Sequence, residues 1–183
     1  MSMIKRNFSF QVLFVCFFLV CHFSAHAVEL AVSAGKGPQF GEDYTNSQLA
    51  MDVIFSDWQR SDEQRISFGA SVTHLKADTK GHDDDLIALS VFPELKLFAE
   101  RFGHRWFFQV RALGPTWLSE KQFGEREQAM HFTFLAQVGG GVYFGEGNRG
   151  YFNAFYRHFS NANLKKPNDG FDVPLNFSVG YRF

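Results

Sequence analysis

Hydrophobic and polar residues alternate along most of the chain after its first 27 residues. The pattern is clearest at the C-terminal end, where odd positions are apolar or aromatic and even positions are polar or small. The odd positions hold Leu175, Phe177, Val179, Tyr181 and Phe183, and the even positions hold Asn176, Ser178, Gly180 and Arg182. A period of two residues indicates a β-strand with two chemically different faces.

Segments of this character recur along the chain, and clusters of Gly, Asp and Asn separate them. The predicted strands cover residues 28–36, 45–58, 64–75, 86–98, 105–117, 129–144, 151–161 and 172–183. Their even number and regular spacing predict an all-β fold, an eight-stranded antiparallel up-and-down β-barrel. Pro93 removes a hydrogen-bond donor from the middle of its strand, so we expect a bulge there.

Alternation alone does not say which face lies inside the barrel. An outer-membrane barrel has apolar residues on its lipid side and polar residues in its lumen, whereas a soluble lipocalin-like barrel has the opposite arrangement. Three features favour a transmembrane β-barrel of the outer membrane: the 24 Phe residues, the length of the strands, and the final residue, Phe183. An aromatic residue at this position resembles the C-terminal signal of bacterial outer-membrane proteins.

Residues 1–27 have the pattern of a secretory signal peptide. Lys5 and Arg6 form the charged start, an apolar stretch follows, and Ala25-His26-Ala27 supplies a small-x-small cleavage site. We therefore expect residues 28–183 to form the β-barrel domain, located in the outer membrane of a Gram-negative bacterium.

Composition excludes several other classes. A formal net charge of -1 and 20% charged residues argue against a disordered chain and against a nucleic-acid-binding protein. Cys16 and Cys21 both lie in the expected signal peptide, which leaves no disulfide framework and no cysteine zinc site. Asp83-Asp84-Asp85 is better explained as a solvated acidic loop than as a cation site, because no regular ligand spacing follows it. We expect no metal and no cofactor.

The predicted strand 151–161 carries the candidate chemistry. Arg157 has the parity of a polar lumen, so His158 and Ser160 point outward, where an unpaired polar group is costly. Two residues apart on one face, they lie about 7 Å apart in Cα, and imidazole could accept the serine proton and activate the hydroxyl for acyl transfer. Asp172 is a plausible carboxylate partner for His158, with Asp169 as its competitor. On these grounds alone, a solvated His and Ser at the membrane interface explain the pattern equally well.

Residues 158–162 (His-Phe-Ser-Asn-Ala) followed by 166–170 (Lys-Pro-Asn-Asp-Gly) resemble the PagL family of lipid A 3-O-deacylases. Members of that family are eight-stranded outer-membrane barrels with a serine-hydrolase site on the outer wall. The resemblance implies that His158 is the general base and Ser160 the nucleophile. It also implies that Asp172 is the acidic member, at a position where the family usually has Glu. Along its strand, however, Asp172 has the parity of the lumen.

The resemblance also implies an oxyanion donor at Asn168. Asn161 is a second candidate donor, although its parity places it on the lumen side. Lys165 and Lys166 lie beside the proposed site and could contact the phosphates of lipopolysaccharide, and Tyr156 could form part of the wall that holds the acyl chains.

The sequence therefore predicts a lipid A 3-O-deacylase, a serine esterase that acts on lipopolysaccharide with its site facing the outer leaflet. Two alternatives stay open: a non-catalytic structural or adhesion barrel, and another membrane acyl enzyme such as a phospholipase or a palmitoyltransferase. A homodimer also stays open as a partner arrangement.

Overall fold

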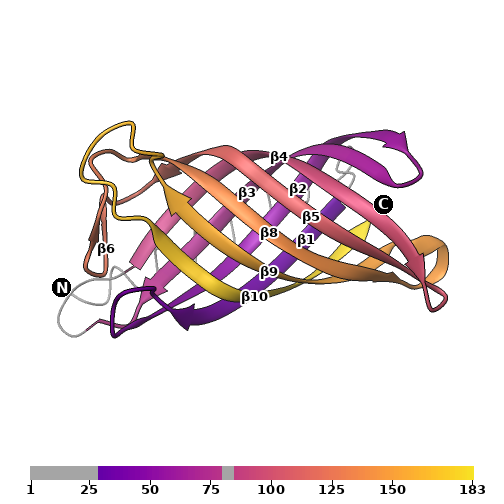
Figure 1. Ribbon diagram of the computed structural model, residues 1–183, viewed down its shortest axis with the longest axis horizontal. Helices are drawn as coiled ribbons and strands as arrows, with labels where there is room; N and C mark the ends of the chain where they lie inside the picture. Colours follow the sequence, from indigo (N-terminus) through magenta and orange to yellow (C-terminus); the bar gives the residue numbers. More distant parts are fainter. Residues whose placement is uncertain (1–28, 80–84) are drawn as a thin grey trace.

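The computed structural model describes residues 29–79 and 85–183. Eight long antiparallel strands form a closed barrel in the order β1-β10-β9-β8-β5-β4-β3-β2 (Figure 1). The long strands are β1 (Glu29–Pro38), β2 (Thr45–Ser61), β3 (Gln64–Ala77), β4 (Asp85–Arg101), β5 (His104–Leu118), β8 (Phe132–Phe144), β9 (Gly150–Ser160) and β10 (Phe171–Arg182). The predicted eight-stranded antiparallel barrel is confirmed. The predicted signal peptide lies outside the described residues, as do Asp83 and Asp84, and stays a prediction.

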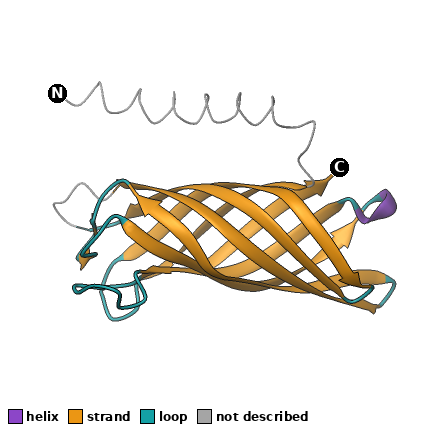
Figure 2. Cartoon of the chain, turned by 90° about the horizontal axis from the view of Figure 1, so that it is seen from above, coloured by secondary structure: helices purple, strands orange, loops and turns teal. Residues whose placement is uncertain are grey.

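The connections differ in length between the two ends of the barrel. At one end, called here the loop end, lie the longer connections, including 39–44, 119–131 and 161–170. At the other, called the turn end, strands are joined by tight turns and by the 3-10 turn η1 (Glu146–Asn148) (Figure 2). Within the described ranges, no helix is long and apolar enough to cross a membrane.

One predicted strand begins later than expected. The segment predicted to start β8 at residue 129 instead belongs to the loop end, and β8 begins at Phe132. The preceding loop forms a small hairpin of β6 (Gln122–Phe123) and β7 (Arg126–Glu127). Gln128 then forms an isolated bridge with Asn168, so this stretch pairs with the loop 161–170 rather than with the barrel.

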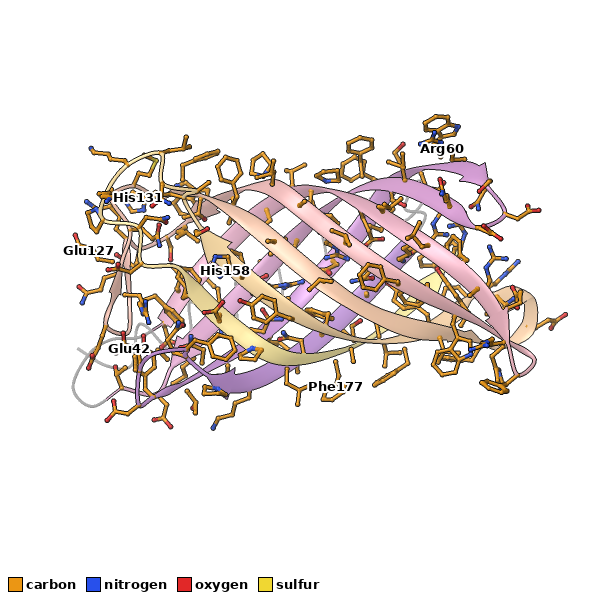
Figure 3. All side chains as sticks on the ribbon, viewed as in Figure 1. Glu42, Arg60, Glu127, His131, His158 and Phe177 are labelled. Atoms are coloured by element: carbon orange, nitrogen blue, oxygen red, sulfur yellow. The ribbon has the colours of Figure 1, made fainter. Side chains whose placement is uncertain are left out.

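The two faces of the wall are chemically opposite. Apolar side chains such as Phe152 (41% exposed) and Phe177 (45% exposed) cover the outside, and Phe177 projects from the barrel in Figure 3. The interior is polar: Arg157 and Lys96 are among its largest fully buried side chains. This arrangement is that of a membrane barrel and excludes the lipocalin-like alternative.

Paired charges fill the interior. Lys96 Nζ lies 2.8 Å from Glu29 Oε2 and 3.3 Å from Glu94 Oε1. Arg111 contacts Glu94 at 2.8 Å and Asp52 at 2.5 Å. Since ions removed from water need partners, each buried charge here is compensated by an opposite one.

An apolar cluster closes the interior at the loop end and supports the ends of β9 and β10. Phe159 stacks on Phe171 with ring centroids 5.2 Å apart, and Phe123 of the small hairpin packs on Phe171 at 5.0 Å. All three side chains are at most 2% exposed. Because Phe159 points inward, its neighbours in β9 point outward.

The barrel wall contains two bulges that matter here. Pairing of β4 with β5 is interrupted between Ser90 and Glu94, but the extra residue is in β5, opposite Pro93, whereas Pro93 itself stays in an unbroken register with Phe68 of β3; the bulge expected in the strand of Pro93 therefore lies in its neighbour. Pairing of β10 with β9 shifts by one residue between Val173 and Asn176. The second bulge determines the geometry of the candidate site.

Candidate active site

His158 and Ser160 lie on the outward face of β9, near its end at the loop end of the barrel. Figure 3 labels His158 there. Both side chains are half-buried, whereas the alternating residues Arg157 and Phe159 are fully buried. In the sheet, His158 pairs with Ala136 of β8 on one side and with Asp172 of β10 on the other. The parity predicted for His158 and Ser160 is therefore the one that the structure has.

Asp172 bonds directly to His158. The distance between Asp172 Oδ1 and His158 Nδ1 is 2.7 Å, and the Asp172 side chain is only 8% exposed. Alternation along β10 would turn Asp172 into the lumen, as Asn176 and Ser178 are. The extra residue between Val173 and Asn176 reverses the alternation, so that Asp172 faces outward beside His158.

The Asn176 side chain holds this bulge. Its Nδ2 donates to Val173 O at 2.6 Å and to Phe155 O at 3.0 Å, which joins the two sides of the shifted register. A Cβ at residue 35 of β1 would overlap the Asn176 side chain, so Gly35 leaves the space that this side chain occupies. Sequence reasoning missed this function of Asn176, although Pro174, a residue without a backbone donor in the middle of the predicted strand, is a signal that could have marked the bulge.

Two further donors bind the Asp172 carboxylate. The Tyr156 hydroxyl donates to Oδ1, the oxygen that also accepts from His158. Gln39 Nε2 donates to Oδ2 at 3.1 Å. With both oxygens accepting hydrogen bonds, the group is suited to remain a carboxylate and to hold the imidazole with Nδ1–H as donor.

Nε2, the other imidazole nitrogen, makes no hydrogen bond within the described residues. Among the described residues no hydrogen bond joins Ser160 to His158, a separation common in substrate-free sites, where such contacts tighten on binding. Gly170 lies against the same edge of the ring: a Cβ there would be 2.6 Å from His158 Cε1 and 3.1 Å from Nε2. The imidazole ring can therefore occupy this position because Gly170 has no side chain.

Asn168 lies in the loop 161–170 with its amide orientation fixed. Its Oδ1 accepts the backbone N–H of Asn161 at 2.7 Å, and a backbone N–H can only donate. Nδ2 is thereby directed away as a donor, with Asn163 Oδ1 at 3.3 Å as its partner.

The Asn161 amide is engaged in the loop itself. Its Nδ2 donates to Lys165 O at 2.8 Å and Pro167 O at 3.3 Å, and the residue is fully buried. Lys165 and Lys166 are exposed, in the same loop.

Asp169, the competing carboxylate, binds elsewhere. Its Oδ2 accepts the backbone N–H of Glu127 at 3.3 Å, and its own N–H donates to Glu127 O at 3.0 Å. Gln128 Nε2 donates to Asp169 O at 2.8 Å. Asp169 thus anchors the loop to the small hairpin, while Asp172 alone bonds to His158.

An aromatic surface continues from the imidazole along the outside of the barrel. Tyr156 stacks with His158 at a centroid distance of 6.5 Å, and Phe40, which is 56% exposed, stacks with Tyr156 at 6.4 Å. Phe152 and Ala154 extend this face of β9 away from the loop end. His158 and Ser160 thus lie at the loop end of an apolar surface on the outside of the barrel.

No group of three or more His, Cys, Asp or Glu residues in the described part of the chain is arranged to hold a metal ion. The chemistry that this site offers is that of a nucleophile and a base: a hydroxyl, an imidazole and a carboxylate in one patch.

A model of the family described as lipid A 3-O-deacylase (PagL) matches residues 43–182. The chain belongs to the PagL family. The resemblance seen in residues 158–170 is thereby confirmed, and so is a lipid A deacylase of the outer membrane as the class of this protein.

Solved structures agree on the fold. The crystal structure of the outer membrane enzyme PagL has a TM-score of 0.62 at 17% identity, and the match covers 85% of this chain and 99% of that one. The crystal structure of Neisserial surface protein A has a TM-score of 0.55 at 15% identity, with 85% and 96% covered. No curated protein sequence matches this chain. Since an enzyme and a surface protein share the barrel, the fold alone does not assign an activity.

Proposed function

We propose that this PagL family member hydrolyses the ester-linked acyl chain at position 3 of lipid A with a Ser-His-Asp triad. The observation that carries the proposal is the 2.7 Å hydrogen bond between Asp172 and His158 on the outward wall, on the same face as Ser160. A buried carboxylate that orients an imidazole beside a hydroxyl is the arrangement of serine hydrolases.

The reaction proceeds in two halves. His158 Nε2 takes the Ser160 proton as Oγ attacks the ester carbonyl, and Asp172 stabilises the imidazolium that forms. The tetrahedral intermediate collapses when His158 gives this proton to the departing 3-oxygen of the sugar, which leaves an acyl-serine. Water, activated by His158, then cleaves the acyl-serine, releases the hydroxy fatty acid and restores Ser160.

Asn168 Nδ2 is the proposed donor to the oxyanion. Its weak contact of 3.3 Å with Asn163 is one that an oxyanion could replace, whereas the Asn161 amide is committed to two loop carbonyls. A lost donor of this kind costs about 2.7–4 kcal/mol of transition-state stabilisation.

The substrate would lie along the outside of the barrel, with the site facing the outer leaflet. Acyl chains would pack on the apolar wall of Phe152, Ala154 and Tyr156. The phosphates would remain at headgroup level near Lys165 and Lys166, which are exposed in the loop above the site.

The test is the mass of lipid A from cells that express the protein. Wild type should remove one ester-linked hydroxyacyl chain, and folded Ser160→Ala and His158→Asn should remove none. Unchanged mass with the wild type would favour a structural barrel, added mass would indicate a palmitoyltransferase, and lysophospholipid release would indicate a phospholipase. Activity that survives in folded Ser160→Ala would overturn the mechanism.

A further inference from the structure

We propose that Gln39 is a positioning residue of this site, and that it acts by locking the rotation of the Asp172 carboxylate. The inference rests on the proposed triad. Gln39 lies directly after β1, outside the matched range 43–182, and is 133 residues from Asp172 in sequence. It is only 1% exposed although it belongs to a loop.

The Gln39 amide has one possible orientation. Its Oε1 accepts the backbone N–H of Asp172 at 3.0 Å and Nδ2 of Asn46 at 2.7 Å. Since a backbone N–H can only donate, the NH₂ group must be the part that faces Asp172 Oδ2, at 3.1 Å. Gln39 therefore holds the main chain and the carboxylate of the same residue.

These contacts replace missing sheet pairing. The ladder between β1 and β10 ends at the pair Lys36–Leu175, so Asp172 lies beyond it. Gln39 takes the Asp172 N–H, and Asn46 Nδ2 donates to Asp172 O at 2.9 Å. Two buried amides thus hold the backbone of Asp172 beyond the end of the β1–β10 ladder.

As a consequence, the two oxygens of the Asp172 carboxylate bind different donors. His158 and Tyr156 donate to Oδ1 from β9, and Gln39 donates to Oδ2 from the opposite side. A carboxylate held at both oxygens cannot rotate away from the imidazole. The titratable groups that face the Asp172 carboxylate are His158 and Tyr156, since Gln39 and Asn46 are uncharged. In the neighbouring loops, Glu42 and Arg126 form an ion pair with each other at 3.0 Å.

Gln39→Glu separates this function from a purely structural one. Glutamate keeps the length and the acceptor oxygen for the Asp172 N–H and Asn46, but in its ionised form it loses the donor to Oδ2; rates are therefore compared at a pH at which the added carboxyl is ionised, because a protonated glutamate would still donate to Oδ2. We expect kcat for lipid A deacylation to fall roughly tenfold with KM within about twofold, while the barrel retains its heat-modifiable gel mobility. If Gln39 only holds the backbone, kcat should stay within about twofold of wild type, which would overturn the inference.

A mutant cycle completes the experiment. In an Asp172→Asn background the same substitution should lower kcat by less than about twofold, because its effect passes through the carboxylate; an additive loss would overturn the inference. Gln39→Met, which lacks both the donor and the acceptor oxygen, is the second variant if the glutamate variant does not fold, and it is read only through the same cycle. Gln109→Met, at an equally buried glutamine of β5 (1% exposed), is the matched control and should keep wild-type kcat.

Failure of the inference is distinguishable from failure of the proposed function. An active Ser160→Ala variant would reject the triad itself. An inactive Ser160→Ala variant together with a fully active Gln39→Glu variant would reject only the positioning by Gln39.

Discussion

Asp172 lies directly opposite His158 across β9 and β10, with 2.7 Å between Oδ1 and Nδ1, although the alternation of β10 assigns Asp172 to the lumen. One extra residue between Val173 and Asn176 explains the difference. A bulge of this kind redirects every side chain that precedes it. The barrel thereby acquires a carboxylate on its outer wall without breaking the polar lining of its interior.

Asp172→Asn should leave a folded barrel with at least about 100-fold lower kcat, because an amide can present its NH₂ to Nδ1 and favour the wrong imidazole tautomer. The loss should be smaller than that of Ser160→Ala. Rates of hydroxy fatty acid release from purified lipopolysaccharide in detergent measure it. Wild-type kcat in the folded variant would contradict a triad role for Asp172.

Gly170→Ala should lower kcat by roughly tenfold or more, because the added Cβ would lie 2.6 Å from His158 Cε1 and the ring must leave the position in which it bonds to Asp172. The free energy of unfolding should change little, since the ring is half-exposed and can yield. Kinetics and urea unfolding in detergent micelles check both statements. An unchanged kcat would show that the imidazole does not need this position.

Asn176→Ala should reduce both stability and activity. It removes the two side-chain hydrogen bonds that span the bulge and leaves Val173 O without its side-chain partner. The free energy of unfolding should fall by about 1–3 kcal/mol. Asn153→Ala is the control, since Asn153 is a buried asparagine (2% exposed) on the lumen side of β9. If both variants lose activity to the same degree, the bulge has no special connection with the site.

Lys96→Met should destabilise the barrel without affecting the chemistry. It leaves Glu29 and Glu94 with less compensation in the interior, and breaking such buried pairs costs about 3–5 kcal/mol. Urea unfolding of the protein in vesicles measures the loss. Activity per folded molecule should equal that of the wild type, because Lys96 contacts Tyr151, seven residues before His158 on β9, and no residue of the site. A selective loss of kcat would reveal a coupling between the interior charges and the site.

The repeating pattern of the chain was sufficient for the barrel. Alternation over 172–183 and its repetition at regular spacing predicted eight strands, and the predicted bounds lie within three residues of the observed ones. At the start of β8, the prediction included residues 129–131, which precede the observed strand. Ala129 is instead bonded to the loop 161–170, through its N–H to Pro167 O at 2.9 Å, and a local pattern cannot report such a contact.

For the site, the sequence by itself determined which face of β9 bears His158 and Ser160, because parity within one strand is a local property. Only the tertiary structure decided that Asp172, and not Asp169, bonds to His158, since the bulge at Val173 shifts register between two strands. The same holds for Gln39, which reaches Asp172 across 133 residues because barrel closure places β1 beside β10. Alternation is a property of neighbouring residues in one strand, so the sequence contains it directly. Register and barrel closure arise from pairing between distant segments. A one-residue shift in that pairing decides on which side of the barrel wall a carboxylate lies.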